Sequence, residues 1–240
     1  MTLTATSTKA LACERHPLIG VRGRGRVSKT TVPSAAIPFT ATPNVYTGTA
    51  LAHNRAAAAT APLTSVSVGL GWDARRTAGP DYDLDLSAVL LPTHRMNSDA
   101  HDLVFYDKLR STHGLVQHSG DHQRGGSAGD DEQINVELAT LADNVEKIAF
   151  LVTMKDALAH QLFFGQVPQA YVRLCNQASG QELVRFDLTE DAKGEQGFHF
   201  GDLFRTNGQW KFRIMGTGEN ADLEFVVSSF GVPVSTFFLP

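Results

Sequence analysis

The sequence predicts an all-β protein, a β-sandwich of two antiparallel sheets with short helices, preceded by a disordered extension. From residue 63 onward, short apolar stretches recur, each bounded by polar residues or glycine. Several of them alternate apolar and polar residues, which is the period of a strand with one buried face. Asn207-Gly208 separates two such stretches, and this dipeptide is typical of tight hairpin turns because both residues tolerate positive φ angles. Many short strands joined by regular turns favour a sandwich.

The expected strands follow one another along residues 63–240. The first is 66–70, where Val66, Val68 and Leu70 alternate with serine and glycine. The apolar run 148–153 is continuous, as expected of a central strand buried on both faces. Residues 221–230 fit either a closing helix or a last strand, because their periodicity does not decide between the two. The remaining expected strands are 83–91, 103–106, 133–138, 170–175, 182–188, 198–205 and 210–214.

Residues 1–62 differ from the rest of the chain in composition. They contain seven basic residues and one acid, and they are rich in alanine, threonine, serine, proline and glycine. Few large apolar side chains are available to offset the entropy of ordering, so we expect mostly disorder, with at most one strand near Ile37–Tyr46. An organelle transit peptide, a non-native extension and a misplaced start all fit this composition. The sequence therefore predicts an extension over 1–62 and a folded domain over 63–240.

Charge and cysteine content exclude several classes of protein. Residues 63–240 contain 24 acids and 14 basic residues, so this domain would repel nucleic-acid phosphates and favour cations. No run reaches the ~18 apolar residues of a membrane-spanning helix, so we expect no membrane span. The chain has two cysteines, Cys13 and Cys175, and such sparse thiols fit a reducing cytoplasm, where we expect the protein to be found.

The first candidate site is an acidic strand. Asp81, Asp83 and Asp85 occupy alternate positions, so they would share one face of the strand at spacings of roughly 7 Å. Carboxylates this close repel one another unless a proton or a cation lies between them. The segment is therefore either part of a site for a hard cation or a solvated acidic face.

The second candidate site is the glycine-rich segment 120–132, which contains Asp121 and ends in Asp130, Asp131 and Glu132. Glycines allow a loop to wrap a small ion, and an all-oxygen ligand set selects Ca²⁺ or Mg²⁺. An ordinary flexible acidic loop is the alternative. The segment starting at Asp81 is not an EF-hand, because Leu86 and Pro92 replace the glycine and glutamate of that motif.

Other motifs carry less weight. Gly125-Gly126-Ser127-Ala128-Gly129 matches a hydrolase elbow, but the expected strand before it and helix after it are missing. His113, His118 and His122 could hold zinc or lie exposed in a loop. A metal-dependent phosphoesterase or nucleotide-handling enzyme, with Mg²⁺ on the aspartates, remains the alternative function, although we find no phosphate-binding loop and no base beside the acids.

Several motifs occur in an order that resembles the TerD family of bacterial tellurite-resistance and general stress proteins. The resemblance covers about residues 63–218. The motifs are Val68-Gly69-Leu70-Gly71-Trp72-Asp73, Asp81-Tyr82-Asp83-Leu84-Asp85, Val104-Phe105-Tyr106, Gly120-Asp121, Gly129-Asp130-Asp131-Glu132-Gln133-Ile134, Phe164-Gly165-Gln166-Val167, Arg185-Phe186-Asp187-Leu188 and Asn207-Gly208-Gln209-Trp210-Lys211-Phe212. The short first strand and the glycine- and alanine-rich final helix that are usual in the family are not clear in this chain.

The resemblance implies a calcium-binding β-sandwich without established enzymatic activity. It places calcium on the two acidic segments, and other stress and tellurium-resistance proteins would be its partners. We therefore expect a cytoplasmic stress-response protein that acts as a binding or scaffold module without catalysis. The metal ligands that the resemblance implies are Asp83, Asp85, Asp121, Asp130, Asp131 and Glu132, with Asp73, Asp81 and Asp156 as further members.

Overall fold

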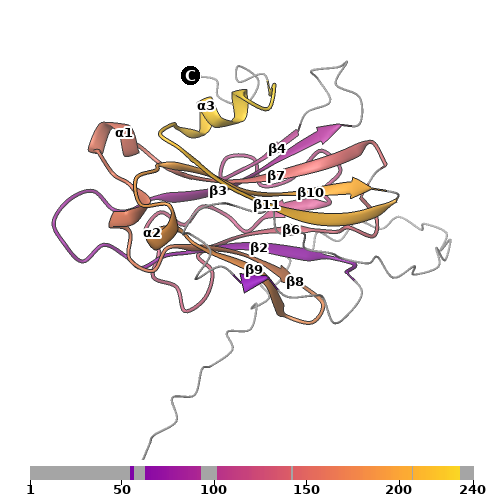
Figure 1. Ribbon diagram of the computed structural model, residues 1–240, viewed down its shortest axis with the longest axis horizontal. Helices are drawn as coiled ribbons and strands as arrows, with labels where there is room; N and C mark the ends of the chain where they lie inside the picture. Colours follow the sequence, from indigo (N-terminus) through magenta and orange to yellow (C-terminus); the bar gives the residue numbers. More distant parts are fainter. Residues whose placement is uncertain (1–54, 57–62, 93–101, 142, 207, 233–240) are drawn as a thin grey trace, which may run out of the picture.

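The computed structural model describes residues 55–56, 63–92, 102–141, 143–206 and 208–232, and these form two antiparallel sheets packed face to face (Figure 1). The predicted β-sandwich with few, short helices is confirmed. One sheet has the strand order β1-β9-β8-β2-β6-β5: Arg55–Ala56, Gln181–Asp187, Tyr171–Asn176, Val66–Gly71, Glu132–Val136 and Val116–His118. The other has the order β11-β10-β7-β3-β4: Gln209–Glu219, Gly197–Thr206, Val145–Met154, Leu84–Pro92 and Asp102–Val104.

The main core lies between the two sheets. Alternating residues of β2, such as Val66 and Val68, meet alternating residues of β3 and β7, such as Leu86 and Phe150. All four of these side chains are fully buried. The alternation that predicted these strands therefore reflects one face turned into the core.

A second apolar cluster lies on the outer face of the five-stranded sheet. There Ala149 and Leu151 of β7 pack with residues of helix α3, Leu223–Ser228, which lies over this sheet (Figure 1). β7 is consequently buried on both faces, as its continuous apolar run predicts. The open choice for 221–230 resolves as a helix, whose first turn is capped by the Asp222 carboxylate accepting a hydrogen bond from the Phe225 N–H.

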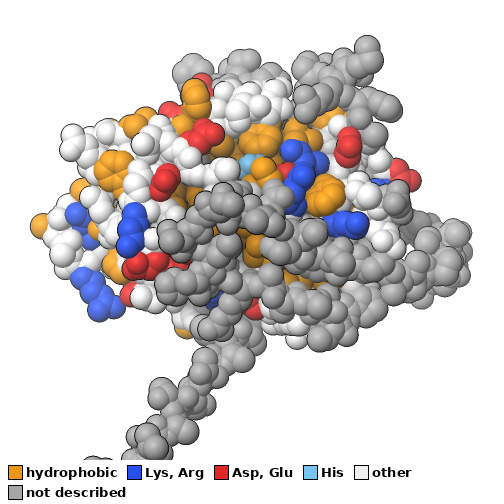
Figure 2. Space-filling model, in the orientation of Figure 1, with side chains coloured by type: hydrophobic (Ala, Val, Ile, Leu, Met, Phe, Trp, Pro, Cys, Tyr) orange, Lys and Arg blue, Asp and Glu red, His pale blue; other side chains and the backbone are white. Residues whose placement is uncertain are grey.

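A hairpin and several short helical segments join the strands. β10 and β11 form the hairpin predicted at residues 207–208, with Thr206 paired to Gln209. The other helical segments of the described residues are α1, α2 and the 3-10 helix η3, over Ala157–His160, Leu188–Asp191 and Phe164–Gln166. Among the described residues, no helix has the length and apolar character needed to cross a bilayer. Acidic and basic side chains are interspersed on the face shown in Figure 2.

Two strands were not expected from the sequence. β5 contributes only three residues to the edge of its sheet, and β1 contributes two, which pair with Val184 and Arg185 of β9. β1 falls inside the expected extension 1–62, whose remaining residues lie outside the described part, as does the strand expected near 37–46.

Candidate metal centre

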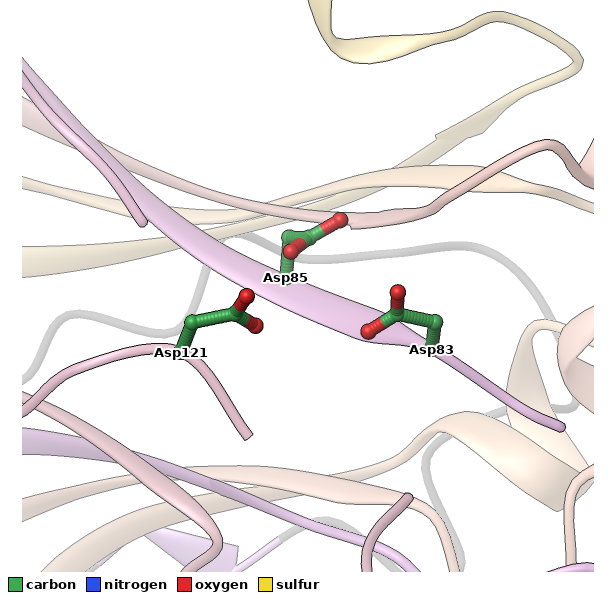
Figure 3. Close-up of side chains that lie close together, drawn as sticks. All are labelled: Asp83, Asp85 and Asp121. Carbon is green, nitrogen blue, oxygen red and sulfur yellow. The ribbon is translucent and has the colours of Figure 1, made fainter. Parts of the chain in front are cut away.

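Three carboxylates come together beside the first residues of β3. Asp83, Asp85 and Asp121 each offer one oxygen, and these oxygens all lie within 4.8 Å of one another (Figure 3). Asp85 is the second residue of β3 and Asp83 directly precedes this strand, whereas Asp121 belongs to the loop 119–131 that connects β5 to β6. The structure thus brings together one acid from the glycine-rich segment and two from the acidic strand. Oxygens at this separation can converge on a single hard cation.

Burial makes this cluster electrostatically unfavourable on its own. Asp85 is only 4% exposed. Its burial, together with the charges of Glu132, Asp83 and Asp121, raises the pKa of Asp85 to about 8. Burial also raises the pKa of Asp83, an effect that the nearby Lys155 ammonium opposes. The carboxylates therefore compete for protons, and a bound cation would relieve their repulsion.

The donor set fits a calcium ion. The Oδ1 atom of Asp83 is buried and accepts no hydrogen bond from the described residues, whereas Oδ2 lies 3.6 Å from the Lys155 Nζ. An unsatisfied buried carboxylate oxygen is costly, and coordination to a cation would satisfy it. Three carboxylates also leave several of the six to eight calcium coordination positions open to other oxygens.

A polar pocket of about 240 Å³ lies next to the cluster, and Asp83 belongs to both. The predicted ligands Asp81 and Asp156 line this pocket. Asp81 pairs with Arg124 at 3.0 Å, and Asp156 adopts a left-handed conformation (φ 52°) before α1. The full lining is Pro80, Asp81, Asp83, Gln123, Arg124, Lys155, Asp156 and His160.

The acidic triplet 130–132 does not join the cluster. Asp130 is buried against Arg173, whose Nε donates to its carboxylate at 2.7 Å, and Tyr171 donates a further hydrogen bond. Asp131 accepts hydrogen bonds from the backbone N–H groups of Trp72 and Ser127, both at 2.8 Å. In the described structure, the Asp130 and Asp131 carboxylates therefore stabilise the fold by accepting hydrogen bonds from other segments of the protein.

Glu132 and Asp73 are also not among the three clustered carboxylates. Both Glu132 oxygens accept backbone hydrogen bonds, from Leu86 and His122. Asp73 is partly exposed and lies 3.6 Å from Arg76. Four of the nine predicted ligands, Asp73, Asp130, Asp131 and Glu132, are thus placed elsewhere, while Asp81 and Asp156 flank the site.

The weaker motifs form no second site among the described residues. His118 is buried and contacts Glu132, His122 lies near Asp131, and His113 is exposed, so the three imidazoles do not form a ligand group. The G-x-S-x-G segment lies in the loop 119–131, without the strand and helix that an elbow needs. Cys175 is buried in β8.

Sequence reasoning missed the basic residues of the pocket. Lys155, Arg124 and His160 come from two connections far apart in the sequence, and no motif marks them. For Lys155, the available signal in the sequence is its position directly after the apolar strand β7. Its backbone N–H donates to the Asp83 carbonyl oxygen, which places the residue at the cluster.

Comparisons with known proteins agree with the fold and the motifs. The family model described as "TerD domain" matches residues 53–230. "Tellurium resistance protein TerD" of Alcaligenes sp is 46% identical over 178 residues, which cover 73% of this chain and 92% of that protein. "General stress protein 16U" of Bacillus subtilis (strain 168) is 40% identical over 173 residues, covering 72% and 90%. A crystal structure from Streptomyces coelicolor A3(2), described as a homologue of telluride resistance protein (TerD), has a TM-score of 0.59 at 23% identity, covering 70% of this chain and 98% of that one.

Proposed function

Because the chain belongs to the TerD domain family of tellurium-resistance and stress-response proteins, we propose that it is a calcium-binding stress protein of the cytoplasm. Calcium would bind at Asp83, Asp85 and Asp121, and the loaded protein would act as a binding or scaffold module without catalysis. Its partners would be other stress and tellurium-resistance proteins.

The observation that carries this proposal is the convergence of three carboxylates on one spot at a buried strand end. One of them, Asp85, is almost fully buried, and Asp83 has an unsatisfied oxygen. Ca²⁺ suits such a site better than Mg²⁺, because it accepts six to eight irregularly placed oxygens, whereas Mg²⁺ demands tight octahedral geometry and keeps its water. The cation would supply charge neutralisation and a link between β3 and the loop 119–131.

A thermal melt tests the metal part of the proposal. At free calcium about a hundredfold above the dissociation constant, the folded state should gain ~2.7 kcal/mol. For a domain of this size, that raises the melting temperature by roughly 5–10 °C. Mg²⁺ should raise it less.

The double variant D83N/D85N should lose the calcium effect, yet be at least as stable as wild type in a chelator, because the repulsion is relieved. Asp73→Asn is the matched control, since it removes one acid outside the cluster, and it should keep the full calcium effect. A calcium-induced rise in melting temperature that persists in the double variant would contradict the assignment of the site.

The scaffold part is tested by capture of partners from a stressed cell extract with the metal-loaded protein. Partners retained by wild type in calcium should be lost in chelator and with the double variant. Identical captures under all conditions would contradict a calcium-dependent module.

The pocket beside the cluster favours one second candidate, a metal-dependent phosphoesterase. Lys155 and Arg124 offer positive charge and His160 offers an imidazole within the same pocket as Asp83, and these are groups that a phosphate ester could use. Turnover of generic phosphate esters in Mg²⁺ or Ca²⁺, abolished by Asp83→Asn, would support the enzyme and contradict the module without catalysis.

A further inference from the structure

We propose that Glu132 is a positioning residue for the cation site, and that its carboxylate sets the separation between Asp85 and Asp121. This inference rests on the proposed calcium function and assigns to Glu132 a role other than that of a ligand. The two oxygens of one carboxylate hold the residues that directly follow two of the three clustered aspartates.

The hydrogen bonds define this arrangement. The Leu86 N–H donates to Glu132 Oε2 at 2.8 Å, and the His122 N–H donates to Oε1 at 3.2 Å. Leu86 follows Asp85 in β3, in the five-stranded sheet, and His122 follows Asp121 in the loop 119–131. Glu132 itself is the first residue of β6 in the other sheet. One side chain therefore ties both sheets and the loop together through the residues next to Asp85 and Asp121.

A buried histidine completes this arrangement. His118 Nδ1 accepts a hydrogen bond from the Gly120 N–H at 3.0 Å, so Nε2 carries the hydrogen. Nε2 lies 3.0 Å from the Leu86 carbonyl oxygen and 3.3 Å from Glu132 Oε2. The side chains of His118 and Glu132 are both fully buried. Solvent therefore cannot replace these partners, and the geometry of the loop entry depends on them.

Only glutamate satisfies this geometry. Its two equivalent oxygens accept from two different backbone N–H groups, whereas a glutamine has one acceptor oxygen and would face the other N–H with a donor. Aspartate keeps both oxygens and the charge but is one methylene shorter, so it cannot span the same distance. Loss of an outer partner of a metal ligand typically lowers metal affinity by about 10–100-fold.

The selectivity between ions separates positioning from a purely structural role. If Glu132 sets the spacing of Asp85 and Asp121, its loss should weaken calcium more than magnesium, because the site would no longer be held open to the larger ion. General destabilisation of the fold would lower both affinities in parallel.

The test is calorimetric titration of the full-length protein with CaCl₂ and with MgCl₂, on wild type, E132D and E132Q. Asp81→Asn is the control, because it removes one charge beside Asp83 and breaks a different contact with the loop, the ion pair between Asp81 and Arg124, while the hydrogen bonds that Glu132 accepts stay in place. We expect E132D to bind calcium about tenfold more weakly or worse, with its net charge unchanged and a reduced preference for calcium over magnesium. D81N should lose less affinity and keep the wild-type preference. Amide exchange at Leu86 and His122 should accelerate in E132D.

The outcomes separate this inference from the proposed function. Wild-type binding together with unchanged affinity and preference in E132D would overturn the positioning role and leave the calcium site standing. Absence of calcium binding by wild type would overturn both. If E132D does not fold, E132Q provides the same comparison, and wild-type affinity and preference in E132Q would likewise overturn the role.

Discussion

At the scale of single residues, neighbouring acids in this chain differ in what surrounds them. Strand alternation correctly places Asp83 and Asp85 on one side, so their proximity was predictable from the sequence. The environments of Asp130, Asp131 and Glu132 could not be predicted from the sequence. Each of these carboxylates depends on a partner that is distant in the sequence: Arg173, Trp72 and Leu86, respectively. Composition and spacing cannot distinguish a carboxylate that binds an ion from one that caps backbone N–H groups.

The raised pKa of Asp85 predicts how the stability of the metal-free protein depends on pH. The folded pKa of about 8 exceeds the ordinary value of 3.8, so between these pH values the folded state binds more protons than the unfolded state. The free energy of unfolding should therefore be highest below pH 4 as far as this group is concerned. It should fall by up to about 1.4 kcal/mol per pH unit as the pH rises towards 8. Denaturant unfolding of wild type and Asp85→Asn in chelator measures this contribution.

Asp85→Asn should lose this part of the pH dependence, because asparagine cannot ionise. Saturating calcium should remove it from wild type as well, since the cation displaces the proton. The same pH profile in wild type and Asp85→Asn would show that Asp85 does not carry the proton.

At the scale of elements, the sequence of a strand depends on the side chains that pass over it as well as on the core against which it packs. A Cβ atom added at Gly69 or at Gly71 of β2 would clash with a neighbouring side chain. It would lie 2.1 Å from Asp130 Oδ2 at Gly69 and 2.5 Å from the Tyr171 hydroxyl oxygen at Gly71. The Asp130 side chain lies over Gly69 and pairs with Arg173, and the Tyr171 hydroxyl beside Gly71 donates a hydrogen bond to the same Asp130 carboxylate. The β2 strand was predictable from its alternation, but the reason for its glycines was not.

Gly69→Ala should therefore destabilise the protein by about 1–3 kcal/mol, the usual cost of overpacking, because the buried Asp130–Arg173 pair must shift. Gly129→Ala is the control, since a Cβ there meets nothing within 4 Å and its φ is not in the left-handed region. Urea unfolding measures both. Equal stability of the two variants would show that the Asp130 side chain does not need the space above Gly69.

The helix α3 shows a different limit of prediction. Its sequence did not decide between helix and strand, because its apolar residues are needed only on the side that faces β3, β4 and β7. The choice depends on tertiary contacts with residues such as Leu103 and Leu151, which sequence periodicity alone does not contain.

At the scale of the whole molecule, the cation site lies where the two sheets are joined. Asp85 belongs to β3 of the five-stranded sheet, Asp83 directly precedes this strand, and Asp121 belongs to the loop that enters β6 of the other sheet. A bound cation would therefore link the two layers, and the stability of the entire sandwich should respond to it. The sheets themselves followed from alternating hydrophobicity and hairpin turns, whereas strand order and the short edge strands β1 and β5 depend on pairings that no local pattern specifies.

The most direct test of this account is a calorimetric titration of calcium into the metal-free protein, comparing wild type with Asp121→Asn and Asp73→Asn. Asp121 lies on the loop, so a single site shared by loop and strand requires that its loss weakens calcium binding. We predict binding by wild type and by Asp73→Asn, and clearly weaker binding by Asp121→Asn. Absence of heat at millimolar calcium, or equal affinity in wild type and Asp121→Asn, would contradict a calcium site built from Asp83, Asp85 and Asp121.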